Sequence, residues 1–501
     1  MLQHLKPLAK DSAIYALGNI SGKLVGFILF PFYVQKLTAG EYGMLATLEA
    51  ASQVIVALAG LNLYVSFIRW YSDKELQGRQ SSVFFTLMAV IAFIAVFINI
   101  CCLPFSSNIS GLLFDSVNYS RVVNLMLLSA CLELFGTVPA TLCRVQSRSL
   151  QYTRNIIIRL GVVLICTILF VVVLDRKLEG IYEAQVIGSM VYVATFIPYI
   201  IRNTVARFEK KILVKMFLYS LPLFLSSFFG VLLNVADRFS LNFISGQATV
   251  GVYAVGLKIA NVLRMIFVQP VSLAITPLMF KMSEKPDASR FYSKLMTYLV
   301  FGMMFIIVAI SLFGQETVKV LTVGSPDYWG AYTIIPFIAF GILFSMMKDQ
   351  AIYSLQIVKR TGVIASVIIF VSLLNLGLNI LLIPFMGAMG AALSNLLSQI
   401  IYFCTMLYYA RRYYPVPYEF MKIFMSVGLG ALFCLIAYLI RDWSLVWRLC
   451  IKTGLLASYP FILYRFRFYD KNELQALQGF WKKWRRPRAL IENIRTLIRE
   501  K

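Results

Sequence analysis

The sequence lacks the residues of most catalytic and metal sites. Its single histidine, His4, lies near the amino terminus, so a histidine-rich metal site is excluded. None of the eight cysteines forms a C-x-x-C pair, and most lie in apolar runs, which argues against a disulfide framework or a thiolate metal site. There is no phosphate-binding P-loop and no G-x-S-x-G motif. We therefore expect neither enzyme activity nor a cofactor or bound metal.

Charge is also scarce. Only 14% of the 501 residues are charged and 59% are hydrophobic, against about 25% and 45–50% in soluble domains. Because a helix needs roughly 20 apolar residues to cross a bilayer, the apolar runs predict an all-α polytopic membrane protein with about fourteen spans. The predicted spans are 12–36, 42–68, 82–103, 121–143, 156–174, 182–201, 216–245, 248–280, 295–314, 330–357, 363–384, 388–410, 423–440 and 447–464.

Acidic residues are few, at 23 against 47 Lys and Arg, which gives a net charge of +24. Most of the basic residues fall in alternate connections between the predicted spans. Since cytoplasmic loops carry the excess of Lys and Arg, this pattern predicts that the amino terminus is cytoplasmic. An even number of spans then places both termini in the cytoplasm. The excess of basic residues is thus explained by topology, and no nucleic-acid partner is expected.

The carboxyl-terminal tail has its own basic cluster with two tryptophans: Trp481, Lys482, Lys483, Trp484, Arg485, Arg486 and Arg488. A basic segment with tryptophan directly after a span is typical of binding to anionic lipid headgroups. A solvated tail that only helps to fix topology is an equal alternative.

Three short matches indicate an internal duplication. Gly40-Glu41-Tyr42 is matched by Gly251-Val252-Tyr253, Leu142 and Gln146 by Ile352 and Gln356, and Gly180 and Ala184 by Gly387 and Ala391. All three pairs are separated by nearly the same number of residues, so they predict two parallel repeats of six spans. Transporters built in this way bind substrate between the repeats. The expected domains are two six-helix bundles at 1–215 and 216–415, two extra helices at 416–466 and a basic tail at 467–501.

Ionisable residues inside predicted spans are costly and mark functional cavities by default. Lys23 and Lys258 lie in opposite repeats and have no acid close by in the sequence, so together they predict an anion site in a central cleft. Arg264 is off the Lys258 helix face and is a weaker candidate. The alternative for Lys258 is that it extends to the membrane surface.

Four further charges form two adjacent pairs, Asp237-Arg238 and Lys348-Asp349. Neighbours on a helix point about 100° apart, so we expect these residues to pair with other helices, or else to contact substrate. Glu49 and Glu133 are the other acids within spans, and either could carry a proton or bind a coupling cation. For Glu133, a bond to a neighbouring helix is the better interpretation.

The run 12–23, Ser-Ala-Ile-Tyr-Ala-Leu-Gly-Asn-Ile-Ser-Gly-Lys, followed by Leu-Thr-Ala-Gly-Glu-Tyr-Gly at 37–43, resembles the start of polysaccharide transporter family proteins. So does the block Asn-Val-Ala-Asp-Arg-Phe-Ser-Leu at 234–241 with Gly-Val-Tyr-Ala-Val-Gly-Leu-Lys-Ile at 251–259. This family, which includes the O-antigen flippases, belongs to the multidrug, oligosaccharidyl-lipid and polysaccharide exporter superfamily.

The resemblance implies a V-shaped pair of bundles, 6+6+2 helices, in the cytoplasmic (inner) membrane. It also implies a flippase for undecaprenyl-diphosphate-linked oligosaccharides, such as the repeat units of O-antigen, capsule or exopolysaccharide. The diphosphate would bind Lys23 and Lys258, with Arg238 and Arg264 as further candidates, while Glu49 or Asp237 would couple transport to an ion gradient. Membrane lipids and a glycan polymerase are the other expected partners.

Two other functions fit the same sequence. The first is a multidrug or cation antiporter of the same superfamily, although its cavity should be acidic and basic residues are the more numerous within the spans. The second is a membrane scaffold that recruits glycan-assembly enzymes through its tail.

Overall fold

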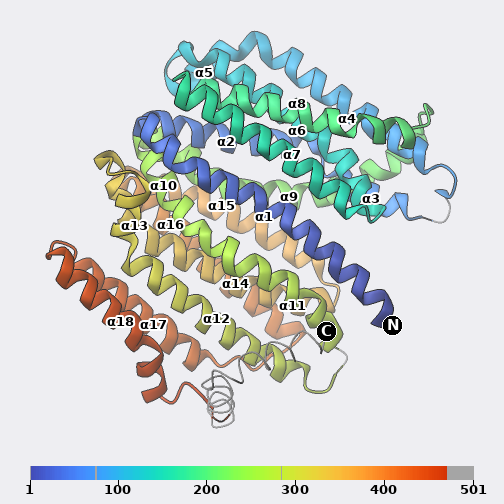
Figure 1. Cartoon of the computed structure of the whole chain (residues 1–501). Helices are drawn as coiled ribbons and strands as arrows, with labels where there is room; N and C mark the ends of the chain where they lie inside the picture. The colour runs from blue at the N-terminus through green and yellow to red at the C-terminus, as the bar shows by residue number, and fades with distance from the viewer. Residues whose placement is uncertain (1, 74–75, 284, 471–474, 476–501) are drawn as a thin grey trace, which may run out of the picture. The chain divides into compact units, whose positions relative to one another are not determined.

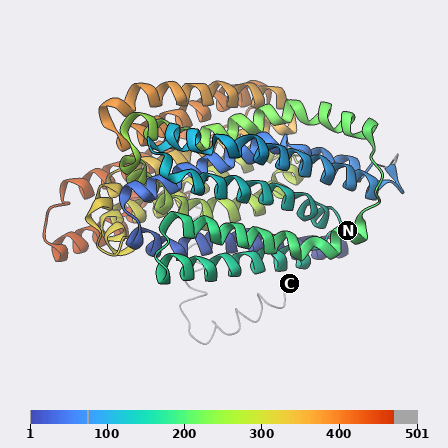
Figure 2. The ribbon, with the colours of Figure 1, turned by 90° about the horizontal axis from the view of Figure 1, so that it is seen from above.

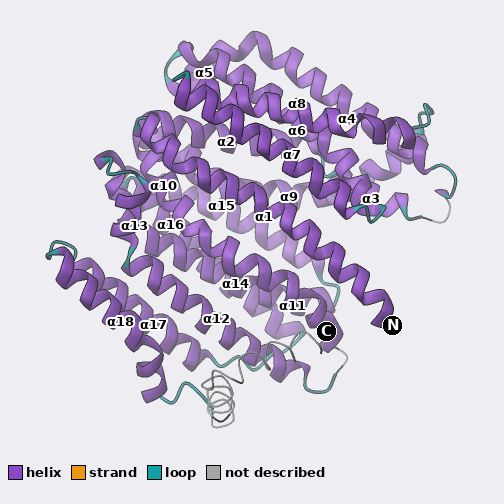
Figure 3. Ribbon diagram, viewed as in Figure 1, coloured by secondary structure: helices purple, strands orange, loops and turns teal. Residues whose placement is uncertain are grey.

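The structure is a computed structural model that describes residues 2–73, 76–283, 285–470 and 475. All regular secondary structure in these ranges is helical (Figure 3). The basic, tryptophan-containing tail segment at 481–488 lies outside these described ranges. By contacts the chain forms two compact units, residues 1–292 with 313–416, and residues 293–312 with 417–501. The bundle boundaries expected from the sequence, and the V shape, remain predictions.

Twelve helical segments within the described residues are long and apolar enough to span a membrane, so this is a multi-pass membrane protein. Helix α1 (Leu2–Lys36) and helix α18 (Leu445–Arg465) are not among the twelve, and the expected count of fourteen is not confirmed. In α18, Arg448 and Lys452 interrupt the apolar run and lower its mean hydropathy.

The first unit begins with the amino-terminal half of the chain (Figure 1). Helices α4, α6, α7 and α8 pack side by side, and α1 packs along α7. Rings of Phe67, Phe84 and Phe196 lie in the apolar core of this half, each fully buried. The helices are α2 (Ala39–Gly60), α3 (Leu63–Tyr71), α4 (Gln80–Cys102), α5 (Ser106–Phe114), α6 (Ser120–Val145), α7 (Ser149–Thr167) and α8 (Lys177–Asn203), with η2 (Leu103–Phe105), η3 (Val117–Tyr119) and η4 (Ile168–Val173).

The second half of this unit repeats the pattern, with α15 packed on both α9 and α16, and α14 on α16. Seen from above, the long helices run alongside one another (Figure 2). The helices are α9 (Lys210–Ser245), α10 (Gln247–Leu263), α11 (Gln269–Met282), α13 (Gly314–Leu321), α14 (Ile335–Ile357), α15 (Thr361–Met386) and α16 (Ala388–Tyr413), with η5 (Arg264–Val268) and η6 (Pro326–Thr333).

One turn occurs in nearly identical form in both halves. Between α6 and α7, Arg148 donates its backbone N–H to Cys143, and its guanidinium lies 5.2 Å from the Tyr199 ring. Between α14 and α15, Arg360 donates to Leu355 and lies 5.1 Å from the Tyr413 ring. The residue before each arginine has a positive φ, 54° at Ser147 and 58° at Lys359. Matched bonds at matched places are what a duplicated chain predicts.

Helices α2 and α10 cross at two glycines. A Cβ on Gly43 would overlap the Gln247 carbonyl oxygen, and a Cβ on Gly251 would overlap the Ala39 carbonyl oxygen. Each glycine therefore lets its helix approach the backbone of the other, and the two contacts are mirrored between the repeats. The structure thus matches Gly43 with Gly251, whereas the sequence comparison had aligned Gly40 with Gly251.

The end of the first unit that holds this crossing is rich in ion pairs. Lys36 binds Asp175 at 3.1 Å, and Lys177 binds Glu41 at 2.8 Å. Arg121 and Arg176 both bind Glu183. The Tyr328 hydroxyl donates to the Leu37 carbonyl, and its ring meets Tyr42 edge-on. Each of the four basic residues at this end, which the predicted topology places on the non-cytoplasmic side, is therefore paired with an acid.

The second unit contains α17 (Phe420–Leu439), α18 and α12 (Ala288–Leu312) from residue 293 onward. Lys294 of α12 binds both Glu419 and Asp470, and Lys422 of α17 binds the same two acids. Burial acts to raise the pKa of Glu419, but hydrogen bonds from Lys294 and Thr297 outweigh it and lower that pKa. Hydrogen bonds from Lys294 and Lys422 lower the pKa of Asp470. This four-charge cluster ties the end of α18 to α12 and α17 within the unit.

Candidate functional site

The structure brings Lys23, Lys258 and Arg264 together. The Lys258 Nζ lies against α1 at Gly26, where an added Cβ would be 3.4 Å away, one turn from Lys23. Arg264 is close enough to Lys23 for the two like charges to repel. In the part of the chain that the structure describes, none of the three forms a salt bridge. We call these three residues the basic cluster.

Arg264 stands at the start of an irregular helical segment. Residues 264–268 form a π-helical segment, η5, just before Pro270 in the continuing helix α11. Proline cannot donate a backbone hydrogen bond, and π-helical turns are frequent at functional sites. Arg264, which regular spacing places off the Lys258 face, is nevertheless within electrostatic reach of Lys23.

Arg238 is not shown in contact with the cluster among the described residues, although Tyr253 is within electrostatic reach of both Arg238 and Arg264. Arg238 is also within electrostatic reach of Tyr42 at the α2–α10 crossing, and its Nε is buried without a hydrogen-bond partner in the described ranges. Its neighbour Asp237 turns into the second half of the unit. The two members of this sequence pair therefore serve different places, as their angular separation on α9 requires.

Asp237 is the centre of a buried polar network. Only 3% of its surface is exposed. It accepts hydrogen bonds from Tyr253 of α10 at 2.7 Å, Asn379 of α15 at 3.0 Å and Asn395 of α16 at 3.2 Å. Asn379 also donates to Asn375, at 3.3 Å. All of these hydrogen-bond partners are neutral donors, and among the described residues Arg238 is the cation within electrostatic reach of Asp237.

Lys348 and Asp349 differ from the prediction. They pair with each other on α14 at 2.8 Å, where a bridge to another helix was expected. Although Lys348 and Asp349 point about 100° apart on the helix, the lysine side chain is long enough to bend toward the neighbouring carboxylate. Contact with other helices is made instead by the Lys348 ammonium, 4.7 Å from the Tyr402 ring, and by the electrostatic attraction between Asp349 and Arg264.

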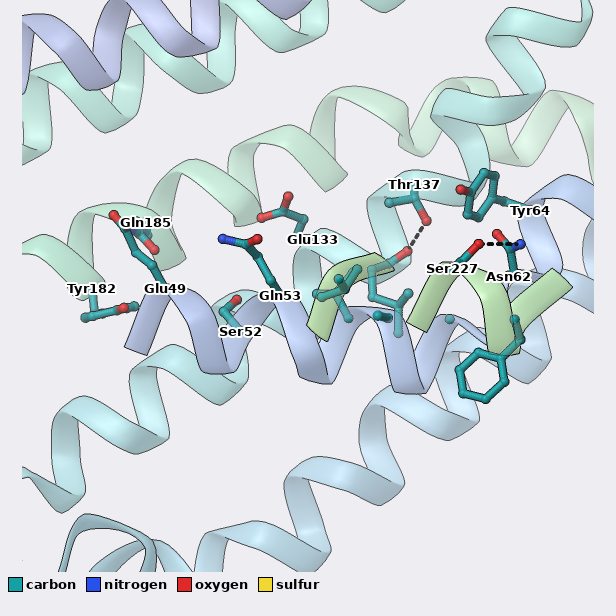
Figure 4. A pocket seen from close by; sticks show the side chains of 16 residues that line it. Glu49, Ser52, Gln53, Asn62, Tyr64, Glu133, Thr137, Tyr182, Gln185 and Ser227 are labelled. Carbon is teal, nitrogen blue, oxygen red and sulfur yellow. Dashed lines mark hydrogen bonds between the residues drawn. The ribbon is translucent and has the colours of Figure 1, made fainter. Parts of the chain in front are cut away.

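Glu49 lies in a cavity of about 460 Å³, which we call the Glu49 cavity (Figure 4). Its walls come from α2, the α2–α3 turn, α3, α6, α8 and α9. The carboxylate of Glu49 is exposed and has no hydrogen bond or ion pair within the described ranges. The lining residues are Glu49, Ser52, Gln53, Val56, Ala57, Gly60, Asn62, Tyr64, Glu133, Leu134, Thr137, Tyr182, Gln185, Phe224, Ser227 and Val231.

Glu133, the second acid of the cavity, is neutralised. It binds Arg159 of α7 at 2.9 Å, the interhelical bond that the sequence favoured for it. Arg159 also lies 5.4 Å from the Tyr192 ring, which fixes its direction. Glu49 is therefore the one lining residue of this cavity whose charge has no partner among the described residues.

Several site residues were missed in the sequence. Asn379 and Asn395 bind Asp237, and Gln53, Tyr182 and Gln185 line the Glu49 cavity. Gln53 follows Glu49 by one helical turn on α2, so a search for polar stripes at that spacing could have found it. The others come from distant helices, and no local pattern relates them to their partners.

Comparison with known proteins decides the family. A family described as polysaccharide biosynthesis protein matches residues 8–283, more than half of the chain. The chain belongs to this family. The match includes Lys23, Glu49, Asp237, Lys258 and Arg264. For this polysaccharide biosynthesis family protein, the resemblance inferred from the sequence is thereby confirmed.

Two proteins of Haemophilus influenzae strain Rd are similar to it. An uncharacterized membrane protein is 25% identical over 289 residues, which are 55% of this chain and 65% of that protein. The chain thus spans a little under two thirds of that relative. A protein named for the Lsg locus is 24% identical over 419 residues, covering 79% of this chain and 97% of the relative.

Solved structures identify the fold. The lipid II flippase MurJ, in an inward closed conformation, superposes with a TM-score of 0.72 at 13% identity, covering 91% of this chain and all of that one. A MATE family multidrug resistance transporter in an inward-facing conformation gives 0.64 at 13% identity, covering 83% and 96%. The family protein therefore shares the fold of these two transporters.

Proposed function

We propose that this protein is a flippase that moves an oligosaccharide linked to undecaprenyl diphosphate across the cytoplasmic membrane. The glycan would be the repeat unit of an O-antigen, capsule or exopolysaccharide. The observation that carries the proposal is the basic cluster of Lys23, Lys258 and Arg264. Asp349 attracts Arg264, but Lys23 and Lys258 have no salt-bridge partner among the described residues. Lysines held at membrane depth in this way need an anion, and a diphosphate offers several acceptor oxygens.

The residues of the basic cluster come from both repeats, which also supports a transport role. Lys23 belongs to the first repeat, and Lys258 and Arg264 belong to the second. Movement of one repeat against the other would separate Lys258 from α1 and change the affinity for the anion. Alternating access needs such a difference between states, because a ligand shifts an equilibrium only through differential binding.

The α2–α10 crossing supports the direction of this cycle. Its glycines bring the two helices into backbone contact at the end that the loop charges predict to be non-cytoplasmic. A closed non-cytoplasmic end is the state in which a substrate made on the cytoplasmic side would be received. Both termini would then face the cytoplasm.

We further propose that Asp237 couples transport to an ion gradient. A buried carboxylate whose hydrogen-bond partners are all neutral donors is able to take up a proton or a small cation, whereas Glu49 is exposed in a cavity. Asp237→Asn should fold, because the amide has the same shape, but export should fall at least about tenfold, since uptake of a charge is removed.

Glycan export by the Asp237→Asn variant, measured with and without an ionophore that collapses the gradient, tests this assignment. The control is Asp442→Asn, which alters an exposed acid on the second unit. Unchanged, ionophore-sensitive export by Asp237→Asn would exclude Asp237 as the coupling residue.

The proposed partners beyond the substrate are anionic lipids at the basic tail and a glycan polymerase that receives the flipped unit. Deletion of the gene in its host tests the function as a whole. The expected result is accumulation of undecaprenyl-diphosphate-linked glycan with loss of surface glycan, both restored by the intact gene. Normal surface glycan in the deletion strain would contradict the proposal.

One observation favours a second function, that of a cation antiporter. The Glu49 cavity carries an unpaired carboxylate, which would attract a cationic drug. The basic cluster on α1 and α10 argues against this function, because it would repel the same molecule. Drug sensitivity of the deletion strain with intact surface glycan would favour the antiporter.

A further inference from the structure

We infer that the Glu49 cavity is a sugar subsite that accepts neutral and amino sugars and excludes sugars bearing a carboxylate. The inference rests on the proposed function, and it adds which part of the glycan is read and by which residues.

The lining of the cavity has the chemistry of a carbohydrate site. Sugars present hydroxyls that both donate and accept hydrogen bonds, together with apolar C–H faces. The cavity offers uncharged groups that donate and accept in the same way, beside exposed aromatic and aliphatic surface. The uncharged polar residues are Ser52, Gln53, Asn62, Tyr64, Thr137, Tyr182, Gln185 and Ser227, and the apolar ones include Val56, Leu134, Phe224 and Val231.

Two polar groups in the cavity have no hydrogen-bond or ion-pair partner among the described residues. The Tyr182 hydroxyl is buried, with 1% of the residue exposed, and has no hydrogen bond to any described residue. It lies beside Glu49, within electrostatic reach of that carboxylate (Figure 4). Buried polar groups are nearly always hydrogen-bonded, so an orphaned hydroxyl at a cavity wall indicates a ligand. A sugar hydroxyl could bond both groups.

Other polar residues of the cavity are already fixed. Asn62 donates to Ser227 at 3.2 Å, joining the α2–α3 turn to α9 (Figure 4). Thr137 donates to the Leu134 carbonyl at 2.6 Å. These bonds hold part of the wall rigid, which reduces the entropy lost when a ligand binds.

The net charge of the lining determines which sugars fit. Arg159 compensates Glu133, so Glu49 leaves the cavity with one uncompensated negative charge. A hydroxyl donates to a carboxylate in a strong, charge-assisted bond, and an ammonium pairs with it. A uronic acid would bring a second carboxylate to the same place, and like charges placed together cost several kcal/mol.

The cavity also lies at a suitable distance from Arg238, which is a further candidate ligand of the diphosphate outside the basic cluster. Val231, in the cavity wall, and Arg238 are seven residues apart on the same face of α9, or about 10 Å at 1.5 Å per residue. Arg238 is one of the candidate diphosphate ligands. A glycan whose diphosphate lies near Arg238 would therefore extend its first sugars toward Glu49.

The test uses a host that lacks its own flippase and carries the full-length protein. The host makes one of two lipid-linked glycans, a neutral hexose repeat or a repeat with glucuronate, and surface display of each is measured. The wild type should display the neutral glycan and at least about tenfold less of the acidic one. Glu49→Gln should raise the acidic-to-neutral ratio at least about tenfold.

Two further variants keep the test independent of folding. Gln53→Glu adds a carboxylate one turn away and should lower the ratio below that of the wild type. Glu179→Gln lies on α8 outside the cavity, where the acid binds Arg121, and should leave the ratio unchanged. Protein amounts in the membrane are compared for every variant.

The other possible results separate failure of the sugar subsite from failure of the proposed flippase function. A ratio unaffected by both Glu49→Gln and Gln53→Glu overturns the sugar subsite while leaving the flippase intact. If the acidic-to-neutral ratio is unchanged but export by Glu49→Gln no longer depends on a sodium or proton gradient, Glu49 binds the coupling ion and the sugar subsite is overturned. No display of either glycan by the wild type, with lipid-linked glycan accumulating, overturns the proposed function and the subsite with it.

Discussion

Replacing Lys23 and Lys258 together by alanine is expected to reduce glycan export at least about a hundredfold. Hydrogen bonds to charged groups contribute roughly 1.5–3 kcal/mol each, and two of them correspond to that factor or more. Neither lysine has a salt-bridge partner among the described residues, so their removal should leave no acid stranded and should not unfold the protein. The measurement is surface glycan together with lipid-linked glycan retained in the inner leaflet.

Two control variants accompany this experiment. Arginine at both positions keeps the charges and should retain most of the export, although an ammonium and a guanidinium differ in geometry. Lys319→Ala removes a lysine whose ammonium lies 4.5 Å from the Trp329 ring, away from the cluster, and should export normally. Full export by the double alanine variant would end the anion-site proposal.

The second large effect is expected at the α2–α10 crossing. Gly43→Ala would place a Cβ on the backbone carbonyl of Gln247, and backbone atoms cannot rotate away as a side chain can. Overpacking of this kind typically costs about 1–3 kcal/mol. Because the crossing closes one end of the first unit, the helices would separate there. Export should fall more than tenfold, and the thermal unfolding midpoint should drop by several degrees.

Gly40→Ala is the matched control on the same helix. The nearest atom to its added Cβ is the Thr38 Oγ1 at 4.0 Å, an ordinary contact. This variant should export and unfold as the wild type does. Equal behaviour of the two alanine variants would show that close contact at Gly43 is not needed for transport.

Much of the fold follows from patterns that are local in the sequence. Long apolar runs predict membrane helices, and short matched segments predict the duplication. The number of spans is less predictable, because α18 carries Arg448 and Lys452, which are buried in the packed protein but lower the mean hydropathy of the helix. The register of the repeat was also off, since Gly40 and Gly43 are equally plausible by sequence and only the helix crossing distinguishes them.

The candidate site was predictable in the parts that depend on charge alone. Lys23 and Lys258 stand out because unpaired cations are rare within spans, and the structure brings them together. The partner of Lys348 was not predictable, because side-chain flexibility decides whether it bonds its neighbour or another helix. The network around Asp237 joins residues more than 140 positions apart, and such contacts follow from tertiary packing alone.

The mirrored glycines at the α2–α10 crossing have a consequence for the origin of the chain. Ala39 faces Gly251 while Gln247 faces Gly43. Each repeat therefore contributes one glycine and one backbone carbonyl that packs against the glycine of the other repeat. This is the contact pattern of a symmetric dimer. A single repeat encoded alone would already possess the complete interface, and fusing two copies would require a connecting segment but no new contact at this point.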